Sequence, residues 1–244
     1  CIMRVKVLGK YGPYPKNGGA TSAYLLTSDS ATVAFELGAG AFVRLINSAD
    51  ISKLDAIIIS HFHFDHCSDV GVLGYYLLRL SAAGKVNLPV KLYCPESDSP
   101  LLIAFKNMKA FDVITVGDGQ EILIKDLSLK FYSVNHPVPC LGFTAYDGSR
   151  MFAYGGDSNE CENLERLVEN ADLALLDGGF LGKDWTNAKP HLSIIKCAGL
   201  AEKYSVKTII SHINPEYDEK DIISEAVSVC DNCLVAGEGE TYEV

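Results

Sequence analysis

One short segment restricts the folds open to this chain more than any other. Residues 60–66 read Ser-His-Phe-His-Phe-Asp-His and directly follow the apolar strand candidate at residues 56–59. His61 and His63 are two residues apart, so in an extended turn their side chains point to the same side, while Asp65 and His66 can reach a neighbouring position. A polar surface loop is the alternative, but three of the six histidines gathered around one aspartate argue against it. The segment predicts a strand that ends at a metal site with room for two ions.

The other three histidines also lie at expected strand ends or helix starts. His136 follows the strand candidate at 127–134 and precedes Pro137, and taken alone it is more typical of a turn. His191 follows a proline at the start of an expected helix and is equally typical of a first helical turn. His212 comes just after a buried strand, where ligands of open α/β sheets gather. The cluster at residues 60–66 favours a role in the same site for all three histidines.

One more carboxylate, Asp157, closes a strand candidate and follows two glycines that let the backbone approach a ligand closely. Bridging two metals is one interpretation, and capping the helix that follows is the other. The acidic run at 216–221 is more simply a favourable first helical turn than a further metal site.

The pattern of elements predicts an α/β protein in a single domain, residues 1–244, because no linker or low-complexity tract interrupts it. A helix is expected at 68–83, and three more at 160–169, 191–204 and 218–228. The expected strands form an opening antiparallel meander, a second sheet region and a final part that alternates with helices. They lie at 5–8, 22–26, 31–35, 56–59, 90–94, 112–116, 121–124, 127–134, 141–146, 151–154, 172–176, 207–211 and 233–235. Residues 56–61 are echoed by 206–212, since each is a buried strand ending in Ser-His, which indicates two similar halves.

The composition of the chain restricts the kinds of molecule that we expect it to bind. The net charge of −10 removes the broad attraction on which non-specific nucleic-acid binding depends, so a small substrate is favoured. No apolar run approaches the roughly 18 to 20 residues that span a bilayer, and no signal-peptide pattern opens the chain. We therefore expect no membrane partner and a cytoplasmic location. The eight cysteines are expected to be reduced, and the Cys230–Cys233 spacing is interpreted as coincidence.

These residues together resemble the metallo-β-lactamase superfamily, from about Val5 to His212. The motifs at 154–157, 191–193 and 211–215 are most similar to its phosphodiesterase branch, which includes tRNase Z. The resemblance implies an αβ/βα four-layer sandwich. It also implies two divalent metal ions, zinc foremost, with manganese or iron as alternatives.

Carried over by position, the resemblance assigns the ligands of each metal. One ion would take His61, His63 and His136, the other Asp65, His66 and His212, and Asp157 would bridge them. Asp65 and His191 are the expected catalytic residues, His191 as a proton donor or a residue behind the ligands.

The sequence departs from the family in two places. Glu36 stands where the family usually has aspartate, so the carboxylate that braces the histidine loop is one methylene longer. The long basic arm of the tRNA-processing members has no counterpart, since Arg150 is the sole basic residue in 137–156. We therefore expect no tRNA substrate.

The expected activity is hydrolysis of a small or cyclic, anionic phosphodiester by a hydroxide shared between the two metals, which lower the pKa of bound water to about 7. Hydrolysis of a thioester or lactone, as in glyoxalase II, is one alternative. A non-catalytic, metal-stabilised binding module is the other. The substrate, the metal and the oligomeric state are left open, with a homodimer among the options.

Overall fold

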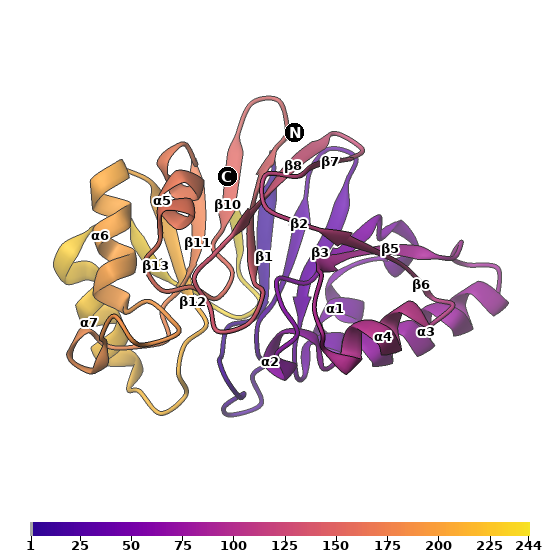
Figure 1. Ribbon diagram of the computed structural model, residues 1–244, viewed down its shortest axis with the longest axis horizontal. Coiled ribbons are helices and arrows are strands. Elements are labelled where there is room, and N and C mark those ends of the chain that lie inside the picture. The colour runs from indigo at the N-terminus through magenta and orange to yellow at the C-terminus, as the bar shows by residue number, and fades with distance from the viewer. Residues whose placement is uncertain (1) are drawn as a thin grey trace.

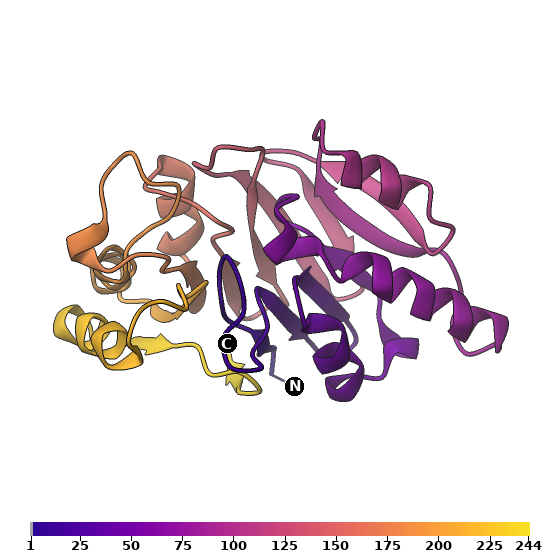
Figure 2. The same ribbon diagram turned by 90° about the horizontal axis from the view of Figure 1, so that it is seen from below.

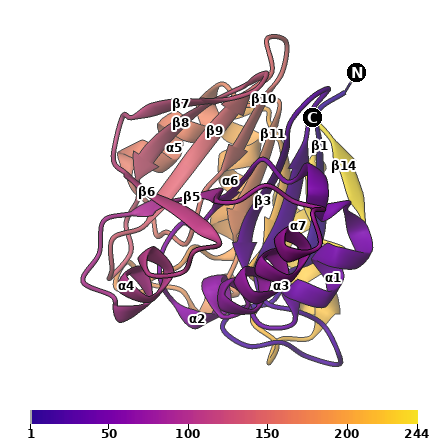
Figure 3. The ribbon, with the colours of Figure 1, turned by 90° about the vertical axis from the view of Figure 1, so that its right-hand side faces the viewer.

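A computed structural model describes residues 2–244, and Cys1 lies outside this range. The described residues form two seven-stranded sheets packed face to face, with helices on the outer face of each (Figure 1). Views from below and from the side show the same layers (Figures 2 and 3). The predicted four-layer α/β sandwich is confirmed.

The first sheet has the strand order β14-β1-β2-β3-β4-β5-β6. Its pairs from β14 to β3 are antiparallel, as the expected meander requires, and those from β3 to β6 are parallel. The strands are β1 (Arg4–Gly9), β2 (Ala23–Thr27), β3 (Thr32–Leu37), β4 (Ala56–Ile58), β5 (Val90–Pro95), β6 (Phe111–Val116) and β14 (Thr241–Glu243). The associated helices are α1 (Ala41–Ser48), the 3₁₀ turn η1 (Ile51–Lys53), α2 (Phe64–Cys67), α3 (Val70–Ala82) and α4 (Pro100–Lys106).

The second sheet repeats this plan in the order β13-β12-β11-β10-β9-β8-β7. Pairs from β7 to β10 are antiparallel, and those from β10 to β13 are parallel. The strands are β7 (Glu121–Ile124), β8 (Leu127–Ser133), β9 (Leu141–Tyr146), β10 (Met151–Tyr154), β11 (Leu173–Asp177), β12 (Lys207–Ser211) and β13 (Cys233–Val235). The helices are α5 (Glu162–Glu169), the 3₁₀ turn η2 (Gly182–Asp184), α6 (Ile194–Tyr204) and α7 (Glu219–Val229).

The two echoed segments lie in the parallel parts of the two sheets, but not at equivalent positions. Strand β4 pairs with β3, next to the antiparallel part, whereas β12 pairs with β11 and β13, one strand further out. The two sheets share one order of antiparallel and parallel pairs, as two similar halves require, and both Ser-His pairs lie where a parallel strand ends.

Three apolar clusters hold the four layers together. The central one fills the space between the sheets with aromatic rings, among them Phe35, whose ring stacks on Tyr24 at 4.9 Å and meets Phe143 edge to face at 5.3 Å. A second cluster joins the first sheet to α1, α3 and α4, and a third joins the second sheet to α5, α6 and α7. Burial of both faces of each sheet makes this core rigid enough to fix the loops at the strand ends.

The short elements α2, η1 and η2 were not predicted, and neither were two longer helices and one strand. Helix α1 follows Gly40, which has a positive φ of 82° and lacks a side chain that could mark the helix start. Helix α4 has such a mark, because Ser99 caps it and Pro100 opens it. Strand β14 pairs with β1 from the other end of the chain, a contact that no local pattern reveals.

The described cysteines are free, as expected. Cys230 ends α7 and Cys233 begins β13, and both side chains are buried. Within residues 2–244, no helix combines the length and the apolar character needed to cross a bilayer.

Candidate metal centre

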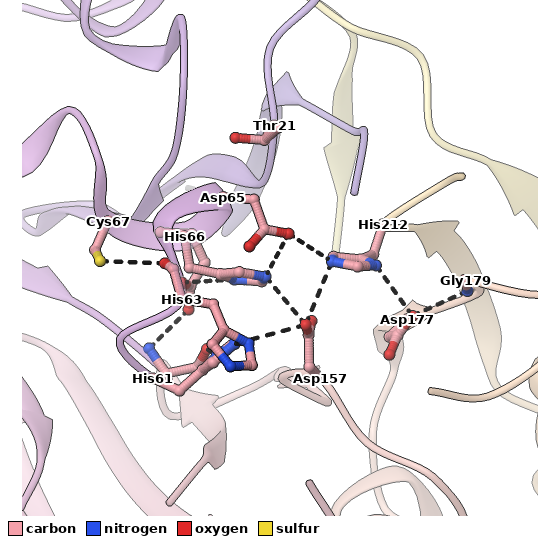
Figure 4. Close-up of polar contacts among 12 residues, drawn as sticks. Thr21, His61, His63, Asp65, His66, Cys67, Asp157, Asp177, Gly179 and His212 are labelled. Carbon is pink, nitrogen blue, oxygen red and sulfur yellow. Dashed lines mark hydrogen bonds and ion pairs between the residues drawn. The ribbon is translucent and has the colours of Figure 1, made fainter. Parts of the chain in front are cut away.

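The seven side chains predicted as metal ligands meet where strands of both sheets end. His61 follows β4, and the short helix α2 carries Asp65 and His66 just beyond it. His136 follows β8, Asp157 follows β10 and His212 follows β12. Six of the seven are labelled in Figure 4, where the side chains from the two halves face one another. Residues separated by up to about 150 positions thus surround one small volume.

The first predicted ligand set is a cluster of three imidazoles. Nε2 of His61 lies 2.9 Å from Nδ1 of His63, and Nε2 of His136 lies 3.2 Å from the same His63 atom. Ser60 Oγ lies 2.9 Å from Nδ1 of His61, and the carbonyl oxygen of Pro190 lies 3.1 Å from Nδ1 of His136. The outer nitrogen of each of these two rings is thus occupied, so its inner nitrogen faces the centre.

The second predicted set lies beside the first. Nε2 of His212 is 3.1 Å from Oδ2 of Asp65, and Nε2 of His66 is 3.6 Å from the same oxygen. One donor atom from each of Asp65, His66 and His212 lies within 4.8 Å of the others, and the same holds for His61, His63 and His136. Both expected groups are therefore brought together by the fold.

Asp157 stands between the two sets. Its Oδ2 lies 3.1 Å from Nε2 of His66, 3.3 Å from Nε2 of His212 and 3.7 Å from Nε2 of His61. The alternative role as a helix cap is excluded, because α5 begins later and Cys161 occupies its N-cap position. Gly156, with φ of 60°, turns the chain after β10 so that the carboxylate enters the centre.

The buried polar atoms of this region fit divalent metal ions. Oδ1 of Asp157 is buried without a hydrogen-bond partner among the described residues, and Nε2 of His66 has only the ion-pair contacts with Asp157 and Asp65 given above. An orphaned buried polar atom is costly unless a ligand satisfies it. Imidazole nitrogens and carboxylate oxygens are also the donors that zinc and similar ions take in proteins. The donor set therefore suits divalent ions held by nitrogen and oxygen.

Glu36 braces the histidine loop from behind, as the family resemblance implied. Its carboxylate accepts hydrogen bonds from the backbone N–H of Ser60 at 2.8 Å and from Nδ1 of His66 at 3.0 Å. Burial disfavours the charged imidazolium of His66, but the negative charges of Asp157 and Glu36 outweigh burial and raise the pKa of His66 to about 10. Glu36 thus fixes which ring nitrogen of His66 points to the centre.

His191 lies at the edge of the centre, with Nδ1 3.7 Å from Oδ2 of Asp157. It precedes α6, which begins at Ile194 with Ser193 as its cap, so its interpretation as a residue of the first helical turn is wrong. Ser193 is the N-cap of α6, because its hydroxyl accepts a hydrogen bond from the backbone N–H of Lys196.

One residue of the site was missed in the sequence. Asp177 ends β11 and accepts a hydrogen bond from Nδ1 of His191 at 2.6 Å. Its Oδ1 accepts from the backbone N–H of Gly179 at 3.0 Å and lies 3.4 Å from Nδ1 of His212 (Figure 4). Burial opposes the charge, yet His191 and His212 outweigh it and lower the pKa of Asp177. A buried strand ending in Asp-Gly-Gly was a usable signal, of the same kind that singled out Asp157.

Two neighbouring segments that the sequence analysis considered for metal or nucleic-acid binding form ordinary secondary structure. Asp218 caps α7, and Glu219 and Asp221 lie in its first turn, so the acidic run forms a helix start as expected. Residues 137–156, where a nucleic-acid-binding arm would lie, consist mainly of the antiparallel pair β9 and β10 joined by a tight turn.

Comparison with known proteins places the chain in a class. Residues 38–213 match the family described as "Beta-lactamase superfamily domain". The match covers most of the chain, which therefore belongs to the β-lactamase superfamily, with the metallo-β-lactamase fold.

Two curated proteins and two solved structures illustrate this relationship. The probable metallo-hydrolase YhfI of Bacillus subtilis strain 168 is 24% identical, over 86% of this chain and 87% of its own. The crystal structure of YhfI superimposes with a TM-score of 0.94 at 25% identity over the whole of both chains. Ribonuclease Z of Methanosarcina acetivorans is 21% identical over 96% of each chain. A diphosphatase of the PhnP family has the same fold, with a TM-score of 0.74 at 18% identity, over 100% of this chain and 98% of the other.

Proposed function

We propose that this protein is a dinuclear metal-dependent phosphodiesterase acting on a small anionic substrate. The observation that carries the proposal is the position of Asp157, whose Oδ2 lies within 3.7 Å of ring nitrogens from both ligand sets. A carboxylate between two groups of donors is suited to bridge two ions. Seven donors shared by two ions also leave coordination positions for a substrate, unlike a closed four-ligand structural site.

The proposed ligands divide as the family resemblance implied. His61, His63 and His136 would hold one ion, Asp65, His66 and His212 the other, and Asp157 both. Two divalent ions held by these residues would supply Lewis acidity and lower the pKa of bound water to about 7. Their positive charge also attracts an anion into a protein of net charge −10.

His191 is suited to protonate the leaving group. Its Nδ1 donates to Asp177, which leaves Nε2 as the ring nitrogen for the substrate. Burial disfavours the imidazolium, but the charge of Asp177 outweighs burial and raises the pKa of His191. In hydrolysis of a phosphodiester, water adds to phosphorus, the P–O bond to one substituent breaks, and the leaving oxygen would take the proton of His191.

A small substrate is favoured by the region around the centre. The hairpin of β9 and β10 stands where an arm for tRNA would be needed, and Arg150 is its sole basic residue. Two of the relatives bear names, ribonuclease and diphosphatase, that describe chemistry at phosphorus. Without a basic arm, this chain is not suited to bind tRNA. Its proposed metal ligands are still suited to hydrolysis at phosphorus.

The test is a pair of assays on protein loaded with zinc or with manganese. We expect turnover of bis(p-nitrophenyl) phosphate and little hydrolysis of a glutathione thioester. The variant His63→Ala should lose phosphodiester turnover and part of its metal content, while the partly exposed control Lys130→Ala should keep both. Thioester turnover without phosphodiester turnover would favour the glyoxalase II alternative. Metal binding without either activity would favour a binding module.

A further inference from the structure

A cavity adjoins the metal centre on the side of His136. Its volume is about 410 Å³, and the ends of β5, β6 and β8 together with the chain after His136 form its walls. We call it the His136 pocket, lined by Pro95, Glu96, Val116, Gly117, Ser133, Val134, His136, Pro137, Val138, Pro139, Cys140 and Leu141. One wall is His136 itself, whose Nε2 lies 3.2 Å from Nδ1 of His63. A phosphate at the metal centre could therefore extend a substituent into this space.

The His136 pocket is lined by several apolar side chains and by no cationic one. Seven of the lining residues are proline, valine or leucine, and none is lysine or arginine. Glu96 is the sole carboxylate, and its side chain is 70% exposed and paired with Lys106 at 3.8 Å. A second anionic group would lose its hydration there without gaining a cationic partner. An uncharged apolar group would gain from the same walls.

The pocket is also stiff and small. Pro95, Pro137 and Pro139 fix the backbone on two sides, so little conformational freedom is lost when a ligand enters. The volume lies near the lower end of the roughly 300–1,000 Å³ of small-molecule sites. It suits one ring system or a short branched chain.

Another cavity of similar size, about 430 Å³, differs in charge and position. It is lined by Lys10 and Lys16 together with Glu216, Asp218 and Glu219, and it contains none of the proposed metal ligands. Lys10 already pairs with Glu219 at 3.2 Å. Of these two cavities, the His136 pocket is therefore the better candidate for part of a substrate held at the metals.

We propose that the His136 pocket binds an uncharged, apolar or flat aromatic substituent of the substrate. The substrate class is then a phosphodiester with one anionic phosphate at the metal centre and one such substituent beside it. This inference rests on the proposed function for the reaction, but the pocket's selectivity can be measured without turnover.

The experiment is calorimetric titration of the zinc-loaded protein with three monoesters that share one phosphate group. We expect phenyl phosphate to bind about tenfold or more tightly than methyl phosphate, because the ring is buried. The added charge of 4-carboxyphenyl phosphate should abolish this advantage. In Val138→Asp, a charge enters the pocket wall and the preference for phenyl over methyl should fall to about twofold or less, while the exposed control Val43→Asp should retain the wild-type ratio.

Each outcome decides one of the two proposals. Equal affinities of phenyl and methyl phosphate for the wild type, or an unchanged ratio in Val138→Asp, would overturn the pocket assignment. If Val138→Asp does not fold, Val138→Trp fills the same space and should weaken phenyl phosphate selectively. Phenyl selectivity in a protein that does not hydrolyse bis(p-nitrophenyl) phosphate would instead uphold the pocket and reject the proposed reaction.

Discussion

Gly12 lies against the ring of His212, so closely that a Cβ atom at position 12 would lie 2.1 Å from Cε1 of that ring. His212 has a φ of 54°, a conformation that costs a non-glycine residue free energy and persists when its surroundings hold it. The surroundings here are two backbone hydrogen bonds, from Gly12 N–H to the carbonyl of Ile213 at 3.1 Å and from Ile213 N–H to the carbonyl of Lys10 at 2.8 Å. The chain before β2 thus holds a proposed metal ligand in place from behind.

This contact predicts that Gly12→Ala displaces His212. We expect elemental analysis to show that the variant loses one of the two metal ions, because the group of His61, His63 and His136 is untouched. The matched control is Gly199→Ala in α6, where a Cβ meets open space. Full metal content and unchanged metal affinity in Gly12→Ala would show that the contact does not position His212.

The Asp177–His191 pair predicts a change in pH dependence. Asp177 raises the pKa of His191, so the protonated acid persists to higher pH than an ordinary histidine. In Asp177→Asn the negative charge is removed and the pKa of His191 falls. We expect kcat for bis(p-nitrophenyl) phosphate to fall by about tenfold or more and its alkaline limb to move to lower pH.

The control for this prediction is the exposed acid-to-amide change Glu121→Gln, which should leave both kcat and the profile unchanged. A uniformly lower rate in Asp177→Asn with the alkaline limb in its original place would indicate a structural role for Asp177 and no effect on the titration of His191.

The sequence predicted those parts of the site that carry a local pattern. The buried strand before His61 and the crowding of polar residues after it were visible within ten residues, and the echo around His212 was visible by comparison of two such stretches. Asp177 lacked a neighbouring histidine in the sequence, and its partner His191 lies 14 positions away. Gly12 can lie against the ring of His212, 200 positions away, because it has no side chain. No local sequence pattern indicates such a contact.

The same distinction holds for the fold. Strands with strong apolar runs and helices with long apolar faces were predicted within a few residues of their observed bounds. Strand β14 was missed because three residues at the chain's end gain their conformation from pairing with β1. Helix α1 was missed because its eight residues follow a glycine with positive φ and end without a basic last turn.

The contact of Glu36 with the proposed metal ligand His66 predicts that substitution of Glu36 lowers metal affinity. In Glu36→Gln, the hydrogen bond from Ser60 N–H can persist, but the charge that orients and polarises the ring of His66 is lost. Loss of such a partner typically lowers metal affinity about 10- to 100-fold. We expect competition with a chromophoric chelator to show this decrease, and the exposed control Glu243→Gln to show none. Wild-type affinity in Glu36→Gln would mean that packing alone holds His66.

Removal of the metals should reveal the charge state of His66. In the metal-free protein, Asp157 and Glu36 raise its pKa from the ordinary 6.5 to about 10, despite burial. A folded-state pKa above the unfolded value stabilises the protein fully below the unfolded pKa, and this contribution is lost as pH rises through the folded pKa. Metal-free protein should therefore melt at progressively lower temperature between about pH 6.5 and pH 10.

Metal-loaded protein should show less of this decline, because a ligating imidazole has already given up its proton. For the same reason, calorimetry in buffers of different ionisation enthalpy should show protons released on zinc binding at neutral pH, and the apparent affinity should rise with pH. If the melting temperatures of the two forms fall in parallel and zinc binding releases no proton, His66 is neutral before the metal arrives. The ion pair between His66 and Asp157 would then not exist in the metal-free protein.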